Sequence, residues 1–233
     1  MPVKAILFDK DGTLLDFERT WGPAIYEIMY TLAQGNAMAM QALAEISLFD
    51  LAARRFHGDS PLIAGTNAEY GIDWAKALGV PADAAFIGRM DELALEYGEK
   101  YATAFDGVDT VLKDLAGAGI TLGVATNDAE RSARAQLAVL GVEGLFSFVA
   151  GYDSGHGSKP EPGMISAFAS ATGVAPDEIM MVGDSLHDLQ AGRAAGVVAV
   201  GVATGFRSAE DLAPHADLVL RDLRDLPLHL ARF

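Results

Sequence analysis

Short apolar runs that end in polar residues alternate along this chain with segments of helical periodicity. Six runs have the length and the Val, Ile, Leu and Ala content of strands: Val3–Phe8, Ile120–Ala125, Phe148–Ala150, Ile179–Val182, Val197–Val202 and Asp217–Leu220. Because they are apolar on both faces, we expect strands of a parallel sheet that helices cover on both sides. Helical patterns lie between them at Val108–Ala118, Ala129–Leu140, Pro162–Thr172 and Leu186–Ala195. The alternation predicts an α/β core with a doubly wound, Rossmann-like parallel sheet.

One long interval interrupts this alternation. Between about Asp16 and Thr103 no strand pattern is convincing, and helical spacing recurs between Gly and Pro breaks. The helical segments are Ala24–Ala33, Ala37–Phe56, Ile63–Leu78 and Ala82–Tyr101. We therefore predict an inserted all-helical domain, residues 16–103, within a core domain made of residues 1–15 and 104–233.

Composition limits the chemistry that this chain of 233 residues can perform. Its 17 Lys and Arg against 32 Asp and Glu give a net charge of −15, which disfavours binding to nucleic acid. The chain has no Cys, so thiolate metal sites and cysteine nucleophiles are excluded. Neither the N-terminus nor the apolar stretch Ala37–Ala53 has the pattern of a signal peptide or a membrane span. We expect a cytoplasmic protein that binds neither nucleic acid nor membranes, and the sequence leaves its oligomeric state open.

Carboxylates follow two of the predicted strands. Asp9 and Asp11 lie two residues apart after the first strand, so an extended chain directs them to the same side. Asp184 follows Ile179–Val182, and Asp188 lies four residues further on. Carboxylates at one edge of a sheet repel one another unless a cation joins them, and this set suits a Mg²⁺-type ion. Taken separately, the first pair is also compatible with a solvated turn, and Asp188 with a cap of the following helix.

Groups suited to phosphate follow two other strands. Thr126 offers a hydroxyl, and Asn127 offers a backbone N–H at the start of a predicted helix. Lys159, before two prolines, offers a positive charge. The alternatives are that Asn127 caps the helix with Glu130 as its partner and that Lys159 is a solvated surface residue.

The four elements together resemble the haloacid dehalogenase superfamily of phosphotransferases. They are D-x-D-G-T at residues 9–13, Thr126, Lys159-Pro160 and G-D-x-x-x-D at residues 183–188. Each fragment alone is a weak signal, but their combination and order are specific. The helical insertion resembles the cap domain of the phosphoglycolate phosphatase-like and β-phosphoglucomutase-like branch.

The resemblance implies a role for each matching residue. Asp9 would attack phosphorus to form an aspartyl-phosphate, and Asp11 would act as the general acid and then the general base. The implied Mg²⁺ ligands are the Asp9 carboxylate, the Asp11 backbone carbonyl and Asp184, with Asp188 orienting the site from a second shell or through water. The implied phosphoryl-binding groups are Thr126, the Asn127 N–H and Lys159.

We therefore expect a Mg²⁺-dependent phosphatase of small, phosphoglycolate-like phosphomonoesters, with a small phosphorylated metabolite as its partner. The alternatives are a phosphomutase of the β-phosphoglucomutase type and, in a different class, a catalytically silent binding module on the same fold. Polar residues of the insertion are candidates for substrate specificity, although each is also compatible with a solvated helix surface. These candidates are Arg19, Arg54, Arg55, His57, Thr66 and Asn67.

Overall fold

The computed structural model describes residues 3–233 and divides the chain into two compact units. The first unit contains the residues through Asp16 together with Thr103–Phe233, and the second contains Phe17–Ala102. Residues 1 and 2 of the predicted core domain lie outside the described residues. Among the helices described, none has both the length and the apolar character needed to cross a membrane.

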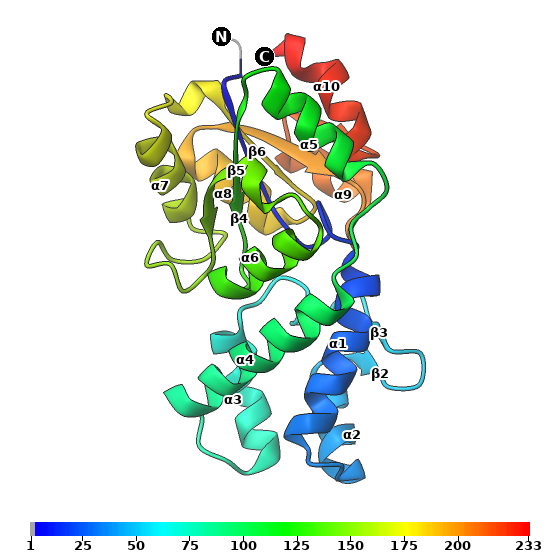
Figure 1. Cartoon of the computed structure of the whole chain (residues 1–233). Helices are drawn as coiled ribbons and strands as arrows, with labels where there is room; N and C mark the ends of the chain where they lie inside the picture. The colour runs from blue at the N-terminus through cyan, green and yellow to red at the C-terminus, as the bar shows by residue number, and fades with distance from the viewer. Residues whose placement is uncertain (1–2) are drawn as a thin grey trace. The chain divides into compact units, whose positions relative to one another are not determined.

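The first unit is built on a parallel sheet of six strands with flanking helices, which confirms the predicted fold class (Figure 1). In spatial order the strands are β5 (Phe146–Ala150), β4 (Thr121–Ala125), β1 (Ala5–Phe8), β6 (Ile179–Gly183), β7 (Val198–Val202) and β8 (Leu218–Leu220). The α-helices of this unit are α5 (Val108–Gly117), α6 (Glu130–Val139), α7 (Gly163–Thr172), α8 (Leu186–Ala195), α9 (Ala209–Leu212) and α10 (Leu226–His229). Short 3₁₀ turns occupy Glu143–Leu145, Pro176–Glu178, Ala213–His215, Leu223–Asp225 and Leu230–Arg232.

Strand β1 lies at the centre of this sheet, where the direction of winding changes. Phe8 is in register with Val124 of β4 on one side and with Val182 of β6 on the other. The chain adds β4 and β5 to one side of β1 and then β6, β7 and β8 to the other. Open α/β sheets bind ligands at the carboxyl ends of the strands at such a switch point. The residues that follow β1 and β6 therefore occupy the position where this fold binds ligands.

Buried apolar side chains fix the position of these strand ends. All four residues of β1 and all five residues of β6 are buried, as expected for strands covered on both faces. One core cluster joins Leu7 of β1 and Met181 of β6 to Phe168 of α7 and Ala191 of α8. The residues that follow β1 and β6 thus extend from a closely packed support.

The second unit consists mainly of four helices, as predicted. They are α1 (Phe17–Leu32), α2 (Ala37–Ile46), α3 (Asn67–Leu78) and α4 (Ala84–Tyr101). Side chains cap the starts of α2, α3 and α4 at Asn36, Thr66 and Asp83, each accepting a hydrogen bond from a backbone N–H of the first turn. Helices α1 and α4 pack against each other along the unit.

The predicted helix Ala37–Phe56 is wrong in its second half. Helix α2 ends at Ile46, and β2 (Phe49–Asp50) pairs with β3 (Arg55–Phe56) in a short antiparallel hairpin. The Asp50 carboxylate accepts hydrogen bonds from the N–H groups of Ala52 and Ala53, at 2.8 and 2.9 Å, and so stabilises the turn. The second unit therefore contains a hairpin in addition to the predicted helices.

Candidate active site

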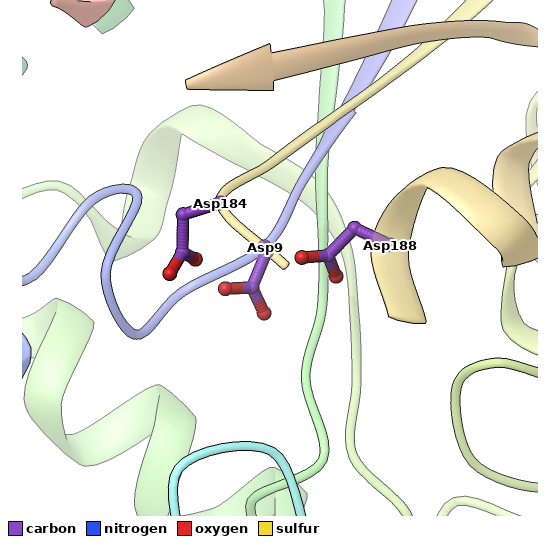
Figure 2. Close-up of side chains that lie close together, drawn as sticks. All are labelled: Asp9, Asp184 and Asp188. Carbon is purple, nitrogen blue, oxygen red and sulfur yellow. The ribbon is translucent and has the colours of Figure 1, made fainter. Parts of the chain in front are cut away.

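Three aspartates converge at the carboxyl ends of β1 and β6. Asp9 directly follows β1, Asp184 directly follows β6, and Asp188 lies in the first turn of α8. Each offers a carboxylate oxygen that lies within 4.8 Å of the other two (Figure 2). All three side chains are buried. Oxygen ligands from a few carboxylates are what Mg²⁺ prefers, so the donor set fits such an ion.

Lys159 places a positive charge against this carboxylate cluster. Its Nζ lies 2.5 Å from Oδ1 of Asp9 and 2.6 Å from Oδ1 of Asp188. Burial would lower the pKa of Lys159, but Asp188 and Asp9 together raise it above its ordinary value, so the ammonium stays charged. Lys159 is 5% exposed, and the interpretation as a solvated surface residue is wrong.

The carboxylate cluster carries more negative charge than Lys159 neutralises. Burial raises the pKa of Asp9 to about 7. Lys159 opposes this increase, whereas the negative charges of Asp188 and Asp11 add to it. Burial likewise raises the pKa of Asp184 well above its ordinary value, with Asp9 and Asp188 adding to the effect. Both shifts express first the cost of burying a charged carboxylate and then the repulsion from the neighbouring carboxylates. A divalent cation at this place would stabilise the charged carboxylates.

Neighbouring backbone and hydroxyl groups hold Asp184 in place. Thr13 Oγ1 donates a hydrogen bond of 3.2 Å to Asp184 Oδ1. The carboxyl group also packs against Gly12 and Gly205 so closely that a Cβ atom at either glycine would collide with it. Thr204 Oγ1 donates to the Gly12 carbonyl at 2.6 Å. Sequence reasoning assigned no role to these residues, although Gly12 and Thr13 belong to the first motif.

Asp188 both caps α8 and belongs to the carboxylate cluster. Its Oδ2 accepts hydrogen bonds from the N–H and the hydroxyl of Ser185, at 3.0 and 2.6 Å, in a capping box. Its Oδ1 accepts from Lys159. The two interpretations of the sequence, a helix cap and a part of the site, therefore hold together.

Asn127 connects the end of β4 to Lys159. Its side-chain Nδ2 donates to the Lys159 carbonyl oxygen, and its Oδ1 accepts from the Lys159 N–H, both at 2.9 Å. Helix α6 begins at Glu130, and its N-cap is Ala129, so the alternative in which Asn127 caps this helix is wrong. Thr126 is 1% exposed beside it, and its hydroxyl accepts a hydrogen bond from the Asp128 N–H.

Asp11 points to a different neighbour. Its Oδ2 lies 2.6 Å from Nζ of Lys10, which is fully buried. The group of three carboxylates that the described residues form does not include Asp11. The contact is compatible with the implied role of Asp11, in which only its backbone carbonyl would bind metal. Sequence reasoning did not single out Lys10, because nothing local marks a lysine at the end of a strand as buried.

The candidate specificity arginines lie in the second unit and are exposed. The Arg54 guanidinium lies 3.9 Å from the centre of the Tyr26 ring, and Arg55 Nε lies 3.0 Å from Glu18 Oε2. Both contacts attach the hairpin to α1. Arg19 lies on α1 itself, and His57 is exposed just after β3.

Thr66 and Asn67 are buried within the second unit. Thr66 caps α3 in a capping box with Glu69. Asn67 Nδ2 donates to Asp91 Oδ1 at 2.6 Å, and Asn67 Oδ1 accepts a short hydrogen bond from the Tyr70 hydroxyl. The bond between Asn67 and Asp91 joins α3 to α4, and the other contacts lie within α3 and its cap. Both polar side chains therefore have bonding partners inside their own unit.

Known proteins resemble this chain over most of its length. Residues 3–196 match the model of the haloacid dehalogenase-like hydrolase family. A phosphoglycolate phosphatase of Xylella fastidiosa is 34% identical over 209 residues, which cover 89% of this chain and 83% of that protein. A phosphoglycolate phosphatase of Rhodospirillum rubrum is 33% identical over 224 residues, with 94% and 87% covered.

A solved structure has the same fold. The crystal structure of a hydrolase from Pseudomonas syringae superposes with a TM-score of 0.71 at 21% identity and covers 99% of both chains. The family match spans both of the motifs that supply the clustered aspartates, D-x-D-G-T and G-D-x-x-x-D. The chain belongs to the haloacid dehalogenase-like hydrolases, in their phosphoglycolate phosphatase-like branch.

Proposed function

We propose that this protein is a Mg²⁺-dependent phosphatase that hydrolyses small, phosphoglycolate-like phosphomonoesters through an aspartyl-phosphate on Asp9. The observation that carries the proposal is the position of Asp9, at the switch point of the sheet, against Lys159 and beside Asp184 and Asp188. The groups that would serve as carboxylate nucleophile, phosphate-binding cation and metal ligands therefore lie together. The phosphoglycolate phosphatases among the relatives support the same substrate class.

The Mg²⁺ ion would be held by the carboxylates of Asp9 and Asp184 and by the backbone carbonyl of Asp11. Asp188 would orient the site from its position between Lys159 and Ser185. When bound, the ion supplies positive charge that balances the carboxylates and the phosphoryl oxygens. The raised pKa of Asp9 and of Asp184 supports this assignment, because burial and the neighbouring carboxylates disfavour the charged forms that a bound cation would favour.

The protein's own residues would then perform two steps. In the first, a carboxylate oxygen of Asp9 bonds to phosphorus, the ester P–O bond breaks, and the leaving oxygen takes the proton of the Asp11 carboxyl group. In the second, Asp11 takes a proton from water, the water oxygen bonds to phosphorus, and the P–O bond to Asp9 breaks. Inorganic phosphate leaves, and Asp9 returns as a carboxylate.

Lys159, Thr126 and the Asn127 N–H would stabilise the transferring phosphoryl group. The negative charge of that group is spread over its oxygens, so fixed donors and a buried ammonium lower the barrier most. Lys159 suits this task because its pKa is raised and its peptide is held by Asn127. The second unit would select the leaving group, and Arg19, Arg54, Arg55, Thr66 and Asn67 stay the candidates for that selection.

The test is phosphate release from a panel of phosphomonoesters that includes 2-phosphoglycolate and hexose phosphates, with Mg²⁺ and with EDTA. We expect the wild type to release phosphate with Mg²⁺ but not with EDTA, and we expect no release from Asp9→Asn in either condition. Release that persists in EDTA or in Asp9→Asn would contradict the proposed mechanism. Failure to release phosphate from any ester would overturn the phosphatase assignment, and conversion of a sugar phosphate into its isomer would then identify a mutase.

A further inference from the structure

Lys10 is a fully buried cation that the proposed reaction does not use. Lys10 lies two residues beyond the end of β1, and its side chain reaches Gln136 of α6. Its Nζ lies 2.6 Å from Oδ2 of Asp11 and 3.1 Å from Oδ2 of Asp128, and it donates a short hydrogen bond to Oε1 of Gln136. These three acceptors match the three hydrogens of an ammonium group.

The acceptors around Lys10 are themselves held in place. Asp128 accepts hydrogen bonds from the Ala129 N–H at 2.7 Å and from the Ser132 hydroxyl at 2.8 Å. The Nε2 atom of Gln136 is buried without a hydrogen-bond partner among the described residues, so the Gln136 amide is oriented by its bond to Lys10. Asp128 and Gln136 thus hold the Lys10 ammonium through two of its three contacts, and Asp11 provides the third.

A buried ion pair of this kind is not explained by stability. Removing charges from water costs about as much as their attraction returns, and apolar residues of similar size often serve a core equally well. A charged side chain can orient the carboxyl group of its partner, and an apolar side chain cannot. At Lys10 that partner is the residue to which the proposed reaction assigns both proton transfers.

We propose that Lys10 is a positioning residue that orients the Asp11 carboxyl group for proton transfer, with Asp128 and Gln136 fixing Lys10 in turn. The inference rests on the proposed phosphatase activity. Without Lys10, the Asp11 carboxyl group would lose its 2.6 Å contact with the buried ammonium and would be oriented less well. Proton donation to the leaving group would slow, whereas attack by Asp9 would keep its own contacts with Lys159.

Leaving groups that differ in basicity separate this role from a structural one. The alkoxide that leaves an alkyl phosphate such as 2-phosphoglycolate needs a proton, whereas the phenolate that leaves p-nitrophenyl phosphate needs little help. We expect Lys10→Met to lower kcat/KM at least about 10-fold more for the alkyl ester than for the aryl ester. An equal loss on both esters would mean that Lys10 only supports the fold, and it would overturn the inference.

A double variant keeps the test decisive. Lys10→Met leaves the partly buried Asp11 and Asp128 without their cation. The double variant Lys10→Met/Asp128→Asn also removes one of the two negative charges and so guards against a failure to fold. We expect this double variant to fold, to show the same change in the ratio of the two esters, and to lose the wild-type orientation of Asp11 in a substrate-free crystal structure. If neither variant folds, or if Asp11 keeps its wild-type orientation, the inference is overturned.

The matched control is Lys113→Met. Lys113 Nζ also lies 2.9 Å from an aspartate, Asp109, but this pair is exposed on α5. We expect the control to keep the wild-type ratio of the two esters, and a change in it would show that the ratio responds to charge in general and overturn the inference. A wild type that hydrolyses neither ester refutes the proposed function itself, whereas an active wild type with an unchanged ratio in Lys10→Met refutes only the role of Lys10.

Discussion

The side chain of Asn127 holds the peptide of Lys159 by two hydrogen bonds of 2.9 Å, one given and one accepted. Asn127 follows β4, and Lys159 lies between β5 and α7, so the pair joins two loops at the carboxyl edge of the sheet. The Lys159 ammonium in turn contacts Asp9 and Asp188. The position of this charge therefore depends on an amide 32 residues away in the sequence.

Asn127→Ala should weaken catalysis at least as much as it weakens the fold. The two hydrogen bonds together contribute about 1–3 kcal/mol. If these bonds hold Lys159 in its catalytic position, their loss raises the activation free energy by this amount, which lowers kcat/KM by about 5- to 150-fold. Steady-state kinetics on the best ester of the panel, with thermal unfolding of the same sample, measures both effects. We expect the unfolding free energy to fall by no more than the same 1–3 kcal/mol.

The control for this prediction is Ser147→Ala. The Ser147 hydroxyl donates to the Leu122 carbonyl at 3.1 Å, so it also joins a side chain to the backbone of a neighbouring segment of the sheet. It lies on β5 at the end opposite the site. A loss of kcat/KM in Ser147→Ala as large as in Asn127→Ala would show that Asn127 acts through general stability.

The parts of the site that the sequence predicts are those that depend on strand ends alone. Once β1 and β6 are recognised, Asp9 and Asp184 must lie at one edge of a parallel sheet, whatever else the chain does. The contacts of Lys10 with Gln136 and of Asn127 with Lys159 join residues 126 and 32 positions apart, and no spacing rule connects them. Such pairs depend on the packing of α6 and of the loop before α7, which only the folded chain defines.

The stability of the metal-free protein should fall as the pH rises through the titration of Asp9. Burial raises the pKa of Asp9 from 3.8 to about 7, so the folded chain holds this proton more tightly than the unfolded chain does. Between those two values the unfolded state binds fewer protons at this group, and the free energy of unfolding decreases with pH. Urea unfolding in EDTA across this pH range measures the effect.

The comparison with Asp9→Asn isolates the contribution of Asp9 from that of other carboxyl groups. The difference in unfolding free energy, wild type minus Asp9→Asn, should fall as the pH rises from 3.8 to about 7. Saturating Mg²⁺ should remove much of this fall, because an ion that binds the folded state stabilises its carboxylates. A difference that stays constant, or rises, would contradict the assignment of buried and unbalanced charge to Asp9.

Thr13→Val should weaken Mg²⁺ binding without removing a ligand. The Thr13 hydroxyl donates to Asp184 Oδ1 at 3.2 Å and so orients a proposed ligand. Loss of such an orienting partner lowers metal affinity by about 10- to 100-fold. The concentration of Mg²⁺ that gives half-maximal activity should rise by that factor, and Thr13→Ser should restore it. Equal Mg²⁺ dependence in all three proteins would show that the hydroxyl does not orient the ligand.

The β2–β3 hairpin shows where periodicity fails as a guide to the fold. Apolar residues continue beyond Ile46 at a spacing that suits a helix, so the pattern predicted one helix as far as Phe56. What ends the helix is local: Leu48 adopts a positive φ of 48°, and Asp50 closes a turn with the N–H groups that follow it. Phe49 and Phe56 then pack edge to face, with ring centres 5.0 Å apart. Phe49 and Phe56, two apolar residues of this pattern, therefore pack across the hairpin instead of along one face of a helix.

Asn67→Ala should destabilise the second unit more than it alters substrate choice. Asn67 is 7% exposed, donates to Asp91 and accepts from Tyr70, so its replacement removes two hydrogen bonds of a buried side chain at a cost of about 1–3 kcal/mol. Gln41→Ala, which loses an exposed bond to Glu45 on α2, should cost only about 0.2–0.5 kcal/mol. Urea unfolding of both variants measures the loss of stability. The ratio of their kcat/KM values on two esters measures any change in substrate preference. Asn67→Ala that keeps wild-type stability but changes the preference between esters would instead establish Asn67 as a specificity residue.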